Sequence, residues 1–113
     1  MDQETALAGA IRLAHACIEG RLTALQTGRE MVALINPWHL AWDALGGAHG
    51  PLAAFFVAQD RAERLHFLGS DVERWHPDVR EERRKELAEA EASATPDVVR
   101  ACHALLDYSA NHQ

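Results

Sequence analysis

Cysteine and histidine give this 113-residue chain its clearest capacity for metal binding or nucleophilic catalysis. They form two close pairs, His15 with Cys17 and Cys102 with His103. Neither pair has the three- or four-residue spacing that puts two ligands on one face of a helix. A zinc site or a Cys–His nucleophile assembled from both pairs stays open as an alternative. Packed or surface side chains are the simpler interpretation, and no cofactor is expected.

Carboxylates are plentiful, and six of the seventeen fall in one charged stretch, residues 78–91, interleaved with arginines and a lysine. Such a stretch predicts a solvated helix face, where paired acids lack the burial that raises a carboxyl pKa for acid–base catalysis. Glu63 and His66 match the Glu-x-x-His motif of di-iron bundles. That design needs two copies, and the chain has one.

The tripeptide His76-Pro77-Asp78 resembles the one through which J-domain co-chaperones stimulate their Hsp70 partners. In that family it lies between two antiparallel helices, of which the first is strongly basic. Here residues 60–75 carry three arginines against four acids. A helix start, with proline at its first position and an acid in its first turn, is the simpler interpretation. The co-chaperone role remains a second alternative.

The charge balance bears on partners. The formal net charge is −6, and residues 51–113 hold twelve acids against eight bases. A chain of this sign disfavours nucleic acid and anionic membranes as partners and can attract a basic protein, although a charge that serves only solubility is the simpler interpretation. The first residues lack the basic and apolar regions of a secretory signal, and no apolar run approaches a membrane span, so a cytoplasmic location with reduced thiols is expected.

Apolar spacing predicts one all-α domain over residues 1–113, a single-domain bundle of about five helices. A stripe from Leu7 to Leu25 predicts the first helix, with Gly28 as its end and Gly20 as a point of weakness or close approach. Residues 29–35 are expected to form a helical turn. Proline or glycine signals then predict four more helices, which start at Asn36-Pro37, Gly50-Pro51, Pro77 and Thr95-Pro96. Gly69 is expected to end the helix that starts at Gly50-Pro51.

From Ala6 to Leu106 this layout resembles a loosely defined group of small bacterial helical proteins of unknown function, some of which are similar to immunity proteins encoded beside secreted toxins. The resemblance is carried by a long N-terminal helix and by the segments Leu52-Ala-Ala-Phe-Phe-Val, Trp75-His76-Pro77, Glu89-Ala-Glu91 and Cys102-His-Ala-Leu-Leu106.

The resemblance implies an interaction protein that occludes a basic toxin. The stripe from Leu7 to Leu25 can close either the core of a monomer or the seam of a homodimer, so both states stay open. Trp75 or Trp38 is the candidate aromatic anchor, although tryptophans at helix entries usually fill the core. The predicted contacts surround the central connection: Glu63, Asp71, Glu73, Trp75, Asp78 and Glu81.

Overall fold

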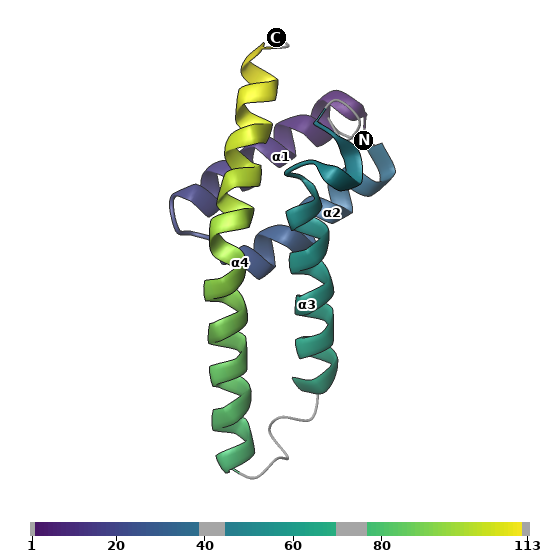
Figure 1. Cartoon of the computed structure of the whole chain (residues 1–113). Coiled ribbons are helices and arrows are strands. Elements are labelled where there is room, and N and C mark those ends of the chain that lie inside the picture. Colours follow the sequence, from purple (N-terminus) through teal and green to yellow (C-terminus); the bar gives the residue numbers. More distant parts are fainter. Residues whose placement is uncertain (1, 39–44, 70–76, 112–113) are drawn as a thin grey trace.

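A computed structural model describes residues 2–38, 45–69 and 77–111 of the chain, and these residues contain four α-helices and one 3-10 turn. No strand occurs in these ranges, so the all-α class is confirmed, while the expected count of five helices is wrong. The elements are α1 (Gln3–Ile18), α2 (Ala24–Trp38), η1 (Gly47–His49), α3 (Ala53–Gly69) and α4 (Pro77–Asn111). Helices α3 and α4 form a long antiparallel pair, and α1 and α2 pack across its upper half (Figure 1).

Helix α1 begins at a capped N-terminus and ends before Gly20. The backbone N–H of Thr5 donates to the Asp2 carboxylate at 2.7 Å, which lowers the pKa of this exposed group. Gly20 has a φ of +82°. The N–H groups of Gly20 and Arg21 donate back to the carbonyls of Cys17 and Ala16, the pattern of a Schellman motif. Gly20 therefore breaks the stripe that predicted one helix from Leu7 to Leu25.

The buried face of α1 is made of small residues. The predicted stripe of leucine and isoleucine is only half-buried within α1, and the fully buried line runs beside it. Because α1 packs against both α2 and α4, its apolar face must be wide, and small side chains at its centre let the helices approach closely. The buried line consists of Ala6, Ala10, Ala14 and Cys17.

Helix α2 starts earlier than expected and runs through the predicted boundaries. Thr23 Oγ1 accepts from the N–H of Gln26, whose side-chain oxygen accepts from the N–H of Thr23, which is a capping box. Gly28 lies inside α2 and faces α3, where a Cβ would come 2.6 Å from the Cβ of Ala58. Pro37 lies in the last turn of α2 and begins no new helix. Most of the helix predicted to start at Asn36 falls after Trp38, in residues 39–44, which lie outside the described ranges.

Helices α3 and α4 carry most of the rest of the core. Gly69 ends α3 and Pro77 begins α4, as predicted. Phe55 and Ala58 are fully buried on α3, and Val98 and Leu105 on α4. The expected start of a new helix at Thr95-Pro96 is wrong, because α4 is one continuous helix of 35 residues that includes both positions. A sequence that matches a capping box, from Ser70 to Glu73, lies outside the described residues.

Candidate functional site

The lower half of the molecule is a two-helix projection, which we call the arm: residues 63–69 of α3 and 77–90 of α4. No other helix packs beside it in Figure 1. The molecule measures 52 × 26 × 25 Å, and its radius of gyration is 15.2 Å. A compact domain of this length has a radius of gyration of about 13 Å. The arm thus lengthens the molecule well beyond what its core requires.

The side chains of the arm that the structure describes are turned toward solvent. Those described are at positions 63, 64 and 81–90, and each of them is exposed or half-buried. Leu87 is 45% exposed and Val57, just above the arm on α3, is 58% exposed; these are the exposed large apolar side chains of the described residues. A pair of helices that leaves so much side-chain surface uncovered offers an accessible surface for another molecule.

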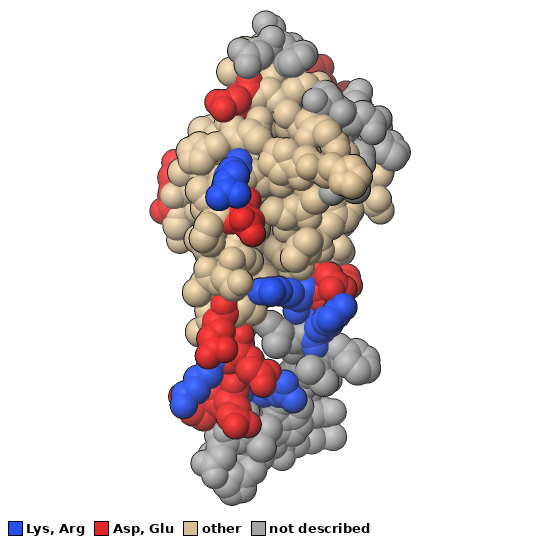
Figure 2. Space-filling model, viewed as in Figure 1, with Lys and Arg blue, Asp and Glu red and all other residues tan. Residues whose placement is uncertain are grey.

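Charges of both signs share the arm. Its sequence holds six acids and five bases, and Figure 2 shows red and blue side chains interspersed there. Arg83 lies 2.6 Å from Glu86, and Arg84 lies 3.7 Å from Glu81. Asp60, just above the arm, lies 3.0 Å from Arg64. Exposed pairs of this kind add little stability, so folding depends little on the arm's charges.

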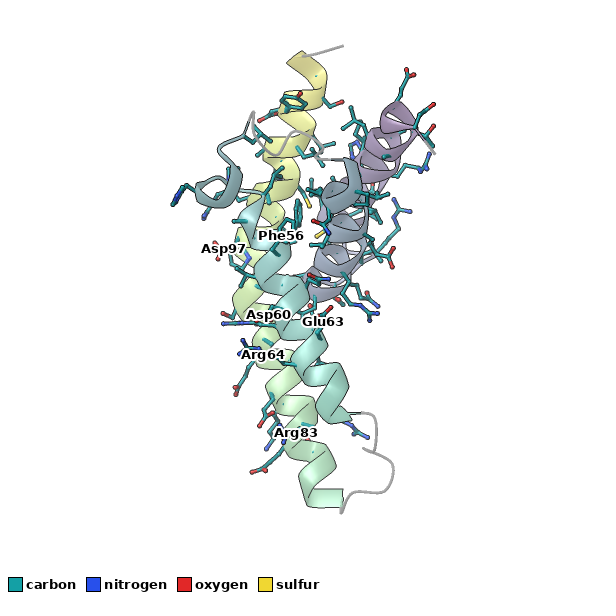
Figure 3. All side chains as sticks on the ribbon, turned by 90° about the vertical axis from the view of Figure 1, so that its right-hand side faces the viewer. Phe56, Asp60, Glu63, Arg64, Arg83 and Asp97 are labelled. Carbon is teal, nitrogen blue, oxygen red and sulfur yellow. The ribbon has the colours of Figure 1, made fainter. Side chains whose placement is uncertain are left out.

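The predicted contact residues are only partly placed. Glu63 is exposed on α3, where its carboxylate accepts from the Gln59 side chain at 3.3 Å, and Figure 3 shows it on the other side of the helix from Asp60 and Arg64. Glu81 is exposed on α4. The backbone of Asp78 lies in the first turn of α4, at the far end of the arm. The remaining three residues lie outside the described ranges: Asp71, Glu73 and Trp75.

A groove along the seam between α3 and α4 was not predicted from the sequence. Two open hollows of about 340 and 390 Å³ share Arg61 and Ser93, and together they lead from η1 toward the arm. The floor consists of small residues, such as Ala54, Ala58 and Ala94, which keep the helices close. Arg61 makes no ion pair with any residue in the described part of the chain. The alanines of α3 are the sequence signal for this groove. They could not have identified it, because they also match ordinary core positions.

Glu91 connects the base of the arm to the rest of the molecule. Its Oε2 accepts a hydrogen bond from the backbone N–H of Leu25 at 3.2 Å, across 66 residues of sequence. Leu25 lies in the first turn of α2, where unpaired N–H groups and the helix dipole favour a negative charge. Glu91 thus fixes α4 to the start of α2. The sequence places it in a charged run, with nothing to distinguish it from Glu89.

The Cys/His pairs separate in the structure. Both cysteines are buried free thiols, whereas His15 and His103 are exposed. Cys17 and Cys102 meet in the core, where burial and the neighbouring thiol raise the pKa of Cys102. Across the described ranges, no three Cys, His, Asp or Glu side chains come together as metal ligands. Glu63 is placed, but the side chain of His66 lies outside the description.

None of the helices, within the ranges described, is both long and apolar enough to cross a membrane. Comparison of the chain with known protein families, with curated proteins and with solved structures finds no match in any of the three.

Proposed function

We propose that this protein is a binding module whose arm occludes a protein partner, and that it acts as an immunity-type inhibitor of a basic toxin. The observation that carries the proposal is the arm itself, whose described side chains all reach solvent. Helix is maintained there although those side chains bury little apolar surface. A projecting helical element with exposed charges of both signs suits insertion into, or coverage of, a concave site on another protein.

The charge of the chain supports a basic partner. With a net charge of −6, the molecule attracts cationic proteins at long range, which speeds encounter without fixing the bound geometry. The mixed charges of the arm then provide specificity, because wrong partners meet like charges. Glu63 and Glu81 are the predicted contact residues on the arm whose side chains are described, and both are exposed.

The proposal is tested by capturing partners from the native lysate and measuring their affinity for arm variants. The double variant Glu63→Lys/Glu81→Lys reverses two exposed charges on the arm. We expect it to weaken a genuine partner at least tenfold, mainly through slower association, with the effect shrinking at high salt. Association and dissociation rates from surface binding assays at two salt concentrations give this result.

A matched control carries the same charge change away from the arm. Glu30 on α2 and Asp107 near the end of α4 are both exposed. Glu30→Lys/Asp107→Lys has the same net charge as the arm variant, so it separates local contact from overall charge. Equal weakening by both double variants would place the binding surface elsewhere, and a captured protein that responds to neither is not the partner.

One observation favours a second candidate function. Pro77 and Asp78, which follow His76 directly in sequence, begin α4 at the far end of an antiparallel helix pair, as the J-domain resemblance requires. The charged residues of α3, however, are two acids and two arginines, so that helix is not basic. Under this candidate, the protein accelerates ATP hydrolysis by Hsp70 and His76→Gln abolishes the acceleration. An Hsp70 hydrolysis rate that the wild-type protein leaves unchanged excludes it.

A further inference from the structure

Two thiols from opposite ends of the sequence meet inside the core. Cys17 lies one residue before the end of α1, and Cys102 lies 85 residues later on the inner face of α4. Helices α1 and α4 pack against each other, and the two side chains lie within hydrogen-bonding reach. Both are buried and neither is bonded to another cysteine. Two neighbouring thiols on a pair of packed helices are an arrangement from which a disulfide can form.

We propose that Cys17 and Cys102 form a reversible disulfide, linking α1 to α4, when the protein meets a small disulfide oxidant such as oxidised glutathione. The pair has no third ligand in the described residues, so it lacks the donor set of a structural zinc site. Oxidation to a disulfide is chemistry that two thiols complete alone. The proposal is independent of the partner-binding function.

The reaction proceeds by two exchanges. The Cys17 thiol loses its proton and its sulfur attacks one sulfur of the oxidant, which releases one glutathione thiol and leaves a mixed disulfide on Cys17. Cys102 then loses its proton and attacks the Cys17 sulfur, which releases the second glutathione. The two protein thiols give up two electrons and two protons, and these reduce one oxidised glutathione to two thiols.

The order of the two exchanges follows from position and environment. Cys17 is 7% exposed and Cys102 is fully buried, so an incoming oxidant reaches Cys17 first. Cys17 also lies in the last turn of α1, next to the Schellman turn at Gly20, where helix ends fray most readily. Burial disfavours the thiolate of Cys102, which keeps this residue unreactive until its partner is already modified.

The bridge would close a loop that includes most of the chain. Because such a loop strongly restricts the unfolded ensemble, the oxidised protein is expected to melt about 10 °C or more above the reduced protein. Since both sulfurs already lie in the core, the folded state should change little.

The experiment incubates the full-length folded protein in glutathione buffers of increasing oxidising ratio, followed by acid quenching, alkylation of the remaining thiols in denaturant and intact mass measurement. We expect an internal disulfide, seen as the loss of two hydrogens without any alkylation, together with the higher melting temperature. Glutathione should accumulate on Cys17 in Cys102→Ser. Cys17→Ser should stay unmodified over the same period.

Three outcomes would overturn the proposal. The first is that both thiols remain open to alkylation at ratios that bridge the same protein in urea. The second is a disulfide between two molecules, seen on a non-reducing gel, and the third is rapid modification of Cys102 in Cys17→Ser. If circular dichroism shows that Cys17→Ser does not fold, Cys17→Ala takes its place, and the wild-type mass still decides whether the bridge forms.

Discussion

At Gly28, the absence of a side chain sets the distance between two helices. A Cβ at this position would lie 2.6 Å from the Ala58 Cβ and 2.8 Å from the Phe55 carbonyl oxygen, so α2 and α3 would have to separate. We expect Gly28→Ala to lower the free energy of unfolding by about 2 kcal/mol, because overpacking against rigid neighbours outweighs the gain in helix propensity. Urea denaturation followed by circular dichroism measures the change.

Gly9 provides the matched control, since it also lies inside a helix. A Cβ there would meet the flexible end of Leu34 at 3.3 Å, which can move aside. Gly9→Ala is therefore expected to be neutral or to stabilise by up to about 1 kcal/mol. If the two variants had the same effect, the close approach at Gly28 would not control the packing of α2 on α3.

Glu91, on α4, caps the start of α2. Replacing it with alanine removes the acceptor for the Leu25 N–H and the negative charge at the start of α2. We expect Glu91→Ala to cost about 1–2 kcal/mol, whereas Glu89→Ala, at an exposed position, should stay within about 0.5 kcal/mol of wild type. Equal denaturation midpoints for the two variants would show that the Leu25 hydrogen bond adds nothing.

At the scale of elements, proline shows where sequence signals mislead. Pro77 does begin a helix, whereas Pro37 and Pro96 lie within helices although their neighbours also resemble helix starts. In α4 the buried positions Ala94 and Val98 continue one inner face across Pro96, whose own side chain is exposed. Packing along that face outweighs the local cost of proline. Analysis of the sequence one element at a time cannot weigh the packing of that face against the cost of the proline.

Because Pro96 persists against its local preference, its replacement should stabilise α4. Pro96→Ala supplies a backbone N–H that can donate within the helix and removes the clash of the ring with the preceding turn. We expect a gain of about 1–2 kcal/mol, since part of the benefit is offset by a less restricted unfolded chain. Thermal and urea unfolding both test this, and a loss of stability would indicate that the helix needs the distortion proline imposes.

The glycines show the same limit. The stripe of apolar residues correctly predicts helix on both sides of Gly20, but the functions of Gly20 and Gly28 are exchanged: Gly20 ends a helix, and Gly28 allows a close approach. Both are uses that glycine serves well, and only the position of α3 decides between them. For the candidate site, the sequence identified exposed acids on the arm, but it missed the groove and Glu91, which depend on contacts between distant segments.

For the whole molecule, the arm and the core are expected to be separable. In the segment 66–86, the side chains described, from 81 onward, bury nothing fully, so replacing the segment with a short Gly/Ser linker should leave the core folded. The melting temperature should change by less than about 5 °C, and the radius of gyration in solution should fall to about 13 Å. Unfolding of the shortened protein would mean that the arm supports the core.

Helix α4 also has a mechanical consequence. A continuous helix of 35 residues is about 52 Å long, which equals the long dimension of the molecule. Helix α4 therefore fixes the distance between α1 and any molecule bound at the tip of the arm. Because the helix is continuous, a torque applied at the tip is transmitted along it to the Glu91 contact at the start of α2.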